Sequence, residues 1–223
     1  MQRIIPFGQR AILIEFDQKI DPFVNQKVHQ LNAVIMQANL PSLSYTVPAY
    51  CSLTLVFEIK IEKPSMLIEK IRSLNEDISL DQKKASVLKK IPVCYDALFA
   101  LDQEDIIQKL GISWEEVIEL HTSQEYLVYM LGFTPGFGFM GKVLPALQIK
   151  RKQIPRTKVP MGSVGLANEQ TGIYPEDIPG GWQIIGRTPL KPFDPNRKEP
   201  FLLKAGDRVQ FYAIGVETFH ELS

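Results

Sequence analysis

The sequence predicts an α+β fold in two parts, a small α/β domain over residues 1 to 88 and a β-barrel or β-sandwich domain over residues 89 to 223. In the first part, apolar residues follow the order strand, helix, strand, strand, helix, which is typical of a ferredoxin-like split βαβ arrangement. In the second part, short strand-like runs are separated by glycine and proline. Asp81 to Lys84 and Lys89-Lys90 flank a polar stretch that we expect to be a solvated linker.

The elements of the first domain follow from spacing and from helix-start signals. Ala11 to Phe16 is an apolar run that predicts a strand, and Asp21 followed by Pro22 predicts a helix that begins with an N-cap and a first-turn proline. Apolar residues at helical spacing extend that helix to about residue 38. Two strands, residues 43 to 47 and 52 to 59, and a second helix, residues 65 to 74, complete the domain.

The second domain begins with a strand over residues 90 to 95, followed by two short helices. Asp102 is expected to cap the first helix, and Ser113 with Glu116 forms a capping box for the second, which ends near His121. After that residue the pattern changes to short strands. We expect them at residues 126 to 133, 164 to 167, 182 to 186, 201 to 203 and 207 to 214.

Bulk composition excludes several classes of function. The 25 basic and 25 acidic side chains cancel, so no global field favours nucleic acid or an anionic membrane. The longest strongly apolar run, Leu127 to Phe133, is too short to cross a bilayer, and Pro6 and Gly8 interrupt the start before a signal peptide can form. The two cysteines, Cys51 and Cys94, are expected to be reduced and buried, with a disulfide as the alternative. We therefore expect a cytoplasmic protein.

Residues 131 to 189 are the expected functional segment. They hold ten of the fourteen glycines and seven of the sixteen prolines, which together favour an unusual backbone path held rigidly. The segment has seven basic residues against three acidic ones, a local excess that suits a carboxylate or phosphate ligand. The alternative is that a barrel needs glycine-rich turns and that the lysines only solvate them.

The run from Gly136 to Lys142 resembles two nucleotide-binding motifs but fits neither. Val143 stands where a P-loop needs Ser or Thr, and Pro145 prevents the helix whose N-terminal amides would meet the phosphates. No acidic residue follows at the distance that a dinucleotide site requires. The phenylalanines of this run fit a hydrophobic wall or a loop that docks a partner.

Four residues are candidates on their own chemistry. His121 is a candidate general acid or base, although a helix C-terminus favours histidine for structural reasons as well. Arg156, between Pro155 and Thr157, is placed to face an oxyanion, with a structural salt bridge as the alternative. Ser163 fits hydrogen bonding to a ligand better than nucleophilic attack, because no helix follows it. Trp182 fits a core or a pocket wall. No metal site is expected, because the three histidines lack ligand spacing.

Four motifs in fixed order are similar to one known family. They are Gly132 to Phe137, Pro155 to Gly165, Gln170 to Pro175 and Pro179 to Pro189, with weaker similarity at Pro48 to Leu53, Phe193 to Pro195 and Lys204 to Val209. The chain resembles the PxpB/KipI family, also called allophanate hydrolase subunit 1 or the carboxyltransferase C and D subdomains. The resemblance implies a small α/β domain followed by a cyclophilin-like β-barrel.

The activity that the resemblance implies is that of the PxpB-type subunit of an ATP-dependent 5-oxoprolinase, which opens 5-oxoproline to glutamate. It implies a PxpC-type and a PxpA-type partner subunit, ATP with Mg²⁺ in the complex, phosphorylation of the lactam oxygen, and no activity of this chain alone. Positive groups such as Arg156 would stabilise the developing charge. The residues expected to line the substrate site are Gly136, Gly162, Ser163, Gln170, Thr171, Tyr174, Gly180, Gly181 and Trp182.

Three departures from the family pattern leave the substrate open. The family has Pro-Tyr-Leu-Gly-Gly where this chain has Gly138 to Lys142, and Leu-Glu-Ser where it has Glu176 to Ile178; Asn168 and Glu169 replace a pair of small residues. Two other functions stay open as well. A regulator of a sensor histidine kinase predicts an exposed apolar patch around Phe133, Phe137 and Phe139. Half of a biotin-dependent carboxyltransferase predicts a biotin carrier in a partner.

Overall fold

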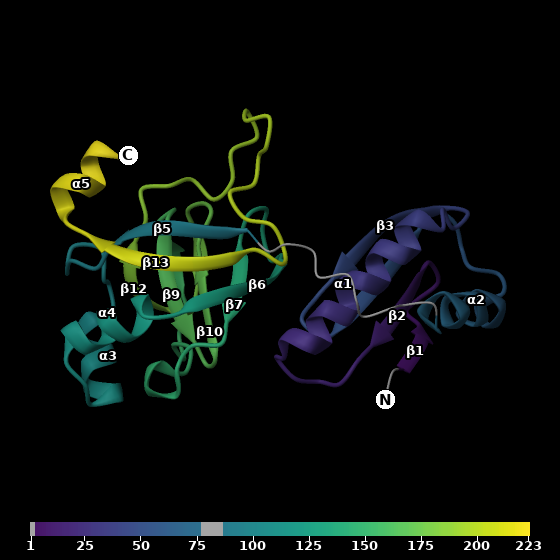
Figure 1. The fold of residues 1–223 in the computed structure, drawn as a ribbon, viewed down its shortest axis with the longest axis horizontal. Coiled ribbons are helices and arrows are strands. Elements are labelled where there is room, and N and C mark those ends of the chain that lie inside the picture. Colours follow the sequence, from purple (N-terminus) through teal and green to yellow (C-terminus); the bar gives the residue numbers. More distant parts are fainter. Residues whose placement is uncertain (1–2, 77–86) are drawn as a thin grey trace. The chain divides into compact units, whose positions relative to one another are not determined.

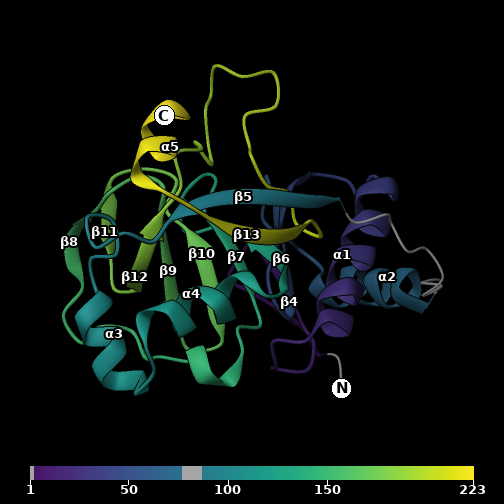
Figure 2. The same ribbon diagram turned by 60° about the vertical axis from the view of Figure 1, so that its left-hand side comes forward.

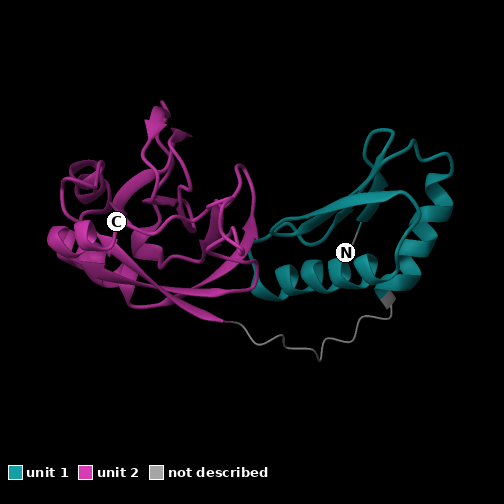
Figure 3. Ribbon diagram, turned by 90° about the horizontal axis from the view of Figure 1, so that it is seen from above, with its two compact units in different colours: residues 1–85 teal, residues 86–223 magenta. Residues whose placement is uncertain are grey.

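A computed structural model describes residues 3–76 and 87–223 of the chain, which divides into two compact units, residues 1–85 and 86–223 (Figure 3). Each unit has its own hydrophobic core. The linker predicted from Asp81 to Lys84 lies outside the described residues. None of the helices in the described ranges is long and apolar enough to cross a membrane.

The N-terminal unit is an antiparallel sheet covered by two helices (Figure 1). The strands are β1 (Arg3–Pro6), β2 (Ala11–Glu15), β3 (Leu43–Pro48) and β4 (Ser52–Phe57), in the order β1-β2-β4-β3, and the helices are α1 (Pro22–Gln37) and α2 (Pro64–Glu76). Every second residue of β4 is buried, so the sheet has one core face.

The start of α1 agrees with the sequence, whereas β1 does not appear in the prediction. The Asp21 carboxylate accepts hydrogen bonds from the backbone N–H groups of Phe23, at 2.9 Å, and Val24, at 3.1 Å, so the predicted N-cap is confirmed. β1 pairs with β2 although it is only four residues long and ends at Pro6. Four residues are too few to show the alternation of apolar and polar residues that identifies a strand. The ferredoxin-like arrangement of the whole unit stays a prediction.

The C-terminal unit contains the predicted barrel, which is closed (Figures 1 and 2). Its strand order is β10-β7-β6-β13-β5-β12-β9, and β13 runs parallel to β5 while the other neighbours are antiparallel. The strands are β5 (Leu88–Cys94), β6 (Glu125–Leu131), β7 (Gly138–Gly141), β9 (Ser163–Ala167), β10 (Gln170–Ile173), β12 (Gln183–Arg187) and β13 (Arg208–Ile214). Inward residues such as Val164, Ile173 and Ile185 fill the barrel.

A second layer lies against the outside of the barrel wall. β8 (Arg156–Val159) pairs with β11 (Ile178–Gly180) as a separate two-stranded sheet. Between this sheet and the barrel is a small core built around Phe137, Tyr174, Trp182 and Ile184. The remaining helices are α3 (Gln103–Leu110), α4 (Trp114–Thr122), the short 3₁₀ helix η1 (Pro145–Leu147) and α5 (Val216–Glu221).

Two predictions for this unit are wrong. Residues 201 to 203 form no strand, and only an isolated bridge joins Phe201 to Phe193. Asp102 does occupy the N-cap position of α3, but its side chain makes no capping hydrogen bond. That carboxylate instead accepts hydrogen bonds from Lys152 and Arg156. The capping of α4 is confirmed, because Ser113 Oγ accepts from the Glu116 N–H at 3.1 Å.

Candidate functional site

Strands make up less than half of the segment from 131 to 189, and connections make up most of the rest. The segment contains β7 to β12, which build part of the barrel wall and the whole of the outer two-stranded sheet. Several of its glycines are needed for close packing: a Cβ on Gly172, for example, would lie 2.9 Å from the Gly138 carbonyl and 3.0 Å from the Trp182 ring. Side chains of this segment that are not packed in a core are therefore presented by strand ends and connections.

Asp102 is the centre of a charged cluster at the end of the outer layer. Its side chain is 1% exposed. The carboxylate accepts from Lys152 Nζ at 2.6 Å, from Arg156 Nη1 and Nη2 at 2.8 and 2.7 Å, and from the Ile184 backbone N–H at 2.8 Å. Burial alone would raise the pKa of the Asp102 carboxyl, but the hydrogen bonds from Arg156, Ile184 and Lys152 bring this pKa below its ordinary value. Asp102 is therefore an anion.

Arg156 and Lys152 are both held by this anion. Arg156 makes a bidentate contact with Asp102 and also donates from Nη2 to the Leu101 carbonyl at 3.3 Å. Lys152 also contacts Asp105 at 3.2 Å, and its hydrogen bond with Asp102 raises the pKa of the ammonium. The two cationic side chains are 24% and 22% exposed, so each keeps one side open to solvent while its charge is largely compensated.

Tyr174 and the glycine pair Gly180-Gly181 lie beside this cluster. Tyr174 is 1% exposed, and a Cβ on Gly180 would lie 2.6 Å from Cε1 of its ring. Burial raises the pKa of the Tyr174 phenol, while a hydrogen bond from the Trp182 backbone and the charges of Arg151 and Arg156 act against that rise. The phenol oxygen therefore lies within the electrostatic field of both guanidinium groups.

His121 is not part of this cluster. It is completely buried inside the barrel unit, where Nδ1 is 2.8 Å from the Tyr95 hydroxyl and Nε2 is 3.0 Å from Thr171 Oγ1. Its ring stacks on Phe211 with centroids 4.6 Å apart. Burial lowers the pKa of His121 to about 3, so the ring is neutral near pH 7. The structure thus brings His121 together with Thr171 and away from Arg156; its acid–base role stays a prediction.

The remaining predicted residues occupy three further places. Ser163 is buried where β9 begins, next to Gly162, which has a positive φ of 81° and packs against the Thr188 carbonyl. Gln170 is half-buried at the β9–β10 turn, paired with Ala167 and Gly141. Gly136 also has a positive φ and packs tightly against Phe193 and Pro175. Only Arg156, Tyr174, Gly180, Gly181 and Trp182 gather at the charged cluster.

Three residues of the cluster were missed by sequence reasoning. The sequence predicts only a helix cap for Asp102, and it marks Arg151 and Lys152 only as members of a basic segment. Asp102 is separated from Lys152 by 50 residues, so no local pattern joins them. The available signal was the surplus of basic residues in the segment. A basic side chain that becomes buried needs a carboxylate partner, and the surplus indicates that this carboxylate comes from outside residues 131 to 189.

The glycine-rich run from Gly136 to Lys142 does not build a nucleotide site. Residues 138 to 141 are strand β7 of the barrel wall, and a 3₁₀ helix of three residues follows at Pro145. No α-helix follows this run directly, as phosphate binding at a helix N-terminus would require. Phe137 is buried and Phe139 is half-buried, which leaves Phe133, at 72% exposed, as the one strongly exposed ring of the three.

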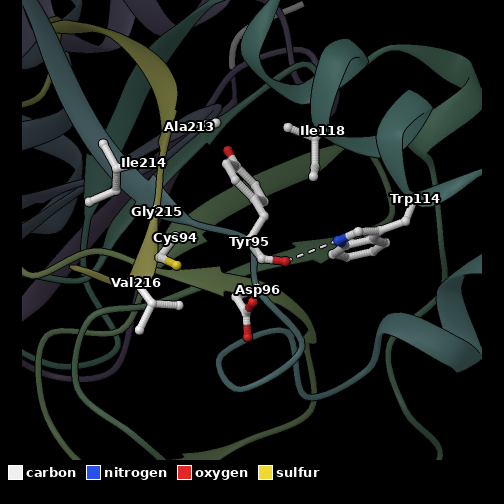
Figure 4. A pocket seen from close by; sticks show the side chains of 9 residues that line it. All are labelled: Cys94, Tyr95, Asp96, Trp114, Ile118, Ala213, Ile214, Gly215 and Val216. Atoms are coloured by element: carbon white, nitrogen blue, oxygen red, sulfur yellow. Dashed lines mark hydrogen bonds between the residues drawn. The ribbon is translucent and has the colours of Figure 1, made fainter. Parts of the chain in front are cut away.

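A shallow hollow of about 260 Å³ lies elsewhere on the barrel unit (Figure 4). It is lined by the ends of β5 and β13, by Trp114 and Ile118 of α4, and by Val216. Trp114 Nε1 donates to the Tyr95 carbonyl oxygen at 3.0 Å across one side of it. None of the predicted site residues lines this hollow, so it is separate from the Asp102 cluster.

Comparison with known proteins gives one consistent family. Residues 2–203 match the carboxyltransferase domain family, subdomain C and D. The chain is 39% identical to the B-type subunit of 5-oxoprolinase from Bacillus subtilis, over 98% of this chain and 95% of that protein. It is 33% identical to the B-type subunit of 5-oxoprolinase from Escherichia coli O157:H7, over 92% of each. The solved structure of TTHA0988 is 36% identical with a TM-score of 0.79; the match covers 92% of this chain and 40% of that one.

Proposed function

This chain belongs to the carboxyltransferase domain family, subdomain C and D, and we propose that it is the B-type subunit of a heteromeric, ATP-dependent 5-oxoprolinase that converts 5-oxoproline to glutamate. The observation that carries the proposal is similarity along nearly the whole chain to the B-type 5-oxoprolinase subunits of two bacteria. The locally cationic Asp102 cluster is compatible with an anionic substrate and product.

We propose that the chain acts with a PxpC-type subunit and a PxpA-type subunit and is inactive alone. Its hollow and its charged cluster are both open to solvent on one side, and a partner surface would be needed to exclude water from a reacting lactam. ATP with Mg²⁺ belongs to the complex. The glycine-rich run of this chain does not fit ATP, because it is a barrel strand without a following helix.

The role proposed for Arg156 is electrostatic. Asp102 already orients the fork of Arg156, that is, the planar set of N–H donors of its guanidinium. A guanidinium held in this way can donate its remaining N–H groups to the oxygen of a lactam as negative charge develops there. Because the guanidinium is already oriented, it does not have to reorganise as the charge on the lactam oxygen develops. Asp102 and Lys152 would position the guanidinium without touching the substrate.

The decisive test is ATP-dependent glutamate release by the reconstituted complex, with and without this chain. We expect release only when the chain is present; equal rates would refute the proposal. Arg156→Lys keeps the charge but removes the fork, and we expect it to lower kcat by about 100-fold, the scale measured for one oxyanion donor. Arg197→Lys, at an exposed arginine paired with Asp194, is the matched control and should keep the wild-type rate.

A regulatory docking protein is the second candidate, and Phe133 is the observation that favours it. This aromatic residue has a positive φ of 69° and is 72% exposed, although a bulky side chain rarely adopts that backbone conformation. It stacks edge-on against Phe137, with ring centroids 5.9 Å apart. If Phe133→Ser abolishes inhibition of a histidine kinase while glutamate release persists, the chain has both functions.

A further inference from the structure

Arg151 differs from the other two cations of the Asp102 cluster. Lys152 and Arg156 are both bound by the Asp102 carboxylate, whereas Arg151 is exposed and, within residues 3–76 and 87–223, its guanidinium makes no hydrogen bond or ion pair. The cluster therefore has one cation whose charge no protein carboxylate compensates. A free guanidinium offers two parallel N–H donors, the geometry that a carboxylate accepts.

The position of Arg151 is set by the backbone on both sides of it. The N–H of Lys152 donates to the Gly181 carbonyl at 2.8 Å, and the Gln183 side chain donates to the Lys150 carbonyl at 3.1 Å. These two bonds hold residues 150 to 152 alongside residues 181 to 183. The guanidinium consequently lies beside Gly181, where an added Cβ would be 3.4 Å from Nη2.

The Tyr174 hydroxyl is the second donor available at this place. It lies against Gly180, next to the glycine that faces Arg151; burial raises the pKa of the phenol, and the Arg151 charge opposes that rise. The Tyr174 hydroxyl donates no hydrogen bond to another residue in the part of the chain that the structure describes, so its proton can be donated to a ligand. Gly180 and Gly181, which are both buried, place no side chain between the two donors.

We infer that Arg151 and the Tyr174 hydroxyl form a subsite for the carboxylate of a small ligand, separate from the Arg156 fork. The ligand class is a monocarboxylate with a compact body. That the carboxylate is the one on 5-oxoproline rests on the proposed function. Arg151 would then set the affinity for the substrate, while Arg156, held by Asp102, faces the reacting lactam.

The test compares two ligands in the full reconstituted complex, 5-oxoproline and its analogue 2-pyrrolidinone, which lacks the carboxylate. For Arg151→Gln we expect the KM for 5-oxoproline to rise about 10- to 100-fold, the loss of one charge-assisted pair. The KM for ATP and the inhibition constant of 2-pyrrolidinone should stay within about twofold. Arg151→Lys should show an intermediate KM, because the charge remains but the fork is lost.

Lys150→Gln is the matched control, because it removes the same charge from the neighbouring exposed residue. We expect its KM for 5-oxoproline to change by less than about twofold. Arg151→Gln should keep the melting temperature of the wild type, since Arg151 has no ion pair to lose. An unchanged KM in Arg151→Gln, or an equal loss of affinity for 2-pyrrolidinone, would overturn the subsite.

Failure of the proposed function is distinguishable from failure of the subsite. If the wild-type complex releases no glutamate, the proposed function falls, and calorimetric titration of the full chain with 5-oxoproline and 2-pyrrolidinone decides the subsite. A preference for the carboxylate compound that disappears in Arg151→Gln upholds it. No preference in the wild type, or one that survives the substitution, refutes it.

Discussion

Asp102 and His121 are both buried polar side chains, and their neighbours hold them in opposite charge states. Asp102 meets two cationic groups and a backbone N–H, which stabilise the carboxylate. His121 meets the hydroxyls of Tyr95 and Thr171 and the rings of Phe211 and Tyr126, none of which compensates a positive charge. A neutral imidazole satisfies this environment with one donor and one acceptor nitrogen.

The depressed pKa of His121 predicts a loss of stability in mild acid. The unfolded histidine titrates near its ordinary pKa of 6.5, whereas the folded value is about 3, so the unfolded state binds the proton first. Stability from this residue is complete above about pH 6.5 and declines as the pH falls towards 3. Between pH 7.5 and pH 5 the expected loss is about 2 kcal/mol.

Urea unfolding followed by tryptophan fluorescence measures this loss, because both tryptophans, Trp114 and Trp182, lie in the barrel unit. We expect His121→Gln to be less stable at pH 7.5 but to depend less on pH between 7.5 and 5. His220→Gln, at an exposed histidine, should keep the wild-type dependence. A pH dependence that is identical in His121→Gln and the wild type would contradict the assignment.

At the scale of elements, strand β11 shows how the space left by a glycine determines where the Tyr174 ring lies. Gly180 ends β11 and faces the Tyr174 ring, while Gly181, the next residue, faces Arg151 and Pro155 at ordinary contact distances of 3.4 to 3.6 Å. The two glycines are adjacent in sequence, but a side chain would overlap a neighbour only at Gly180. Gly180 admits the ring between the outer sheet and the barrel wall, whereas Gly181 is buried beside Arg151 and Pro155.

The difference predicts opposite outcomes for two neighbouring substitutions. Gly180→Ala puts a Cβ 2.6 and 2.7 Å from Cε1 and Cζ of Tyr174, so the ring or the strand must move, and we expect a loss of about 1–3 kcal/mol in the free energy of unfolding. Gly181→Ala meets no such overlap and should stay within about 0.5 kcal/mol. Chemical denaturation of both variants checks this; equal losses would show that Tyr174 does not constrain Gly180.

At the scale of the whole molecule, the chain is two units in sequence, and none of the cores in the described ranges is shared between them. The N-terminal core is built only from residues of the first unit, including Ile12, Leu31 and Leu55, and the barrel core only from residues of the second. The proposed subsite, the Asp102 cluster and His121 all belong to the second unit. The first unit therefore supplies none of the candidate chemistry described for this chain.

Separate cores predict separate folding. We expect a fragment of residues 86–223 to unfold cooperatively and to keep the tryptophan emission maximum of the full chain, and a fragment of residues 1–85 to fold on its own. Circular dichroism and fluorescence melts of both fragments against the full chain check this. A barrel fragment that is unfolded at 25 °C would show that its stability depends on the first unit.

Local patterns determined much of the fold and part of the site. Helical and strand spacing predicted α1, α2, α4 and most barrel strands, because those elements bury one face of a regular period. The glycine- and proline-rich segment correctly contained Arg156, Tyr174 and the glycine pair that gather at the cluster. Five strands escaped prediction because they are only three or four residues long: β1, the barrel strands β7 and β10, and the outer strands β8 and β11.

Long-range pairing decided what the local sequence left open. Sequence order alone did not indicate that Asp102, at a helix start, binds Arg156 and Lys152 across about 50 residues, or that His121 is enclosed by the barrel. Those facts depend on barrel closure, which brings distant strands together and decides which charges are compensated and which remain free. Composition made this protein locally cationic; the tertiary structure left Arg151 as the cation of the Asp102 cluster without a protein partner among the residues that the structure describes.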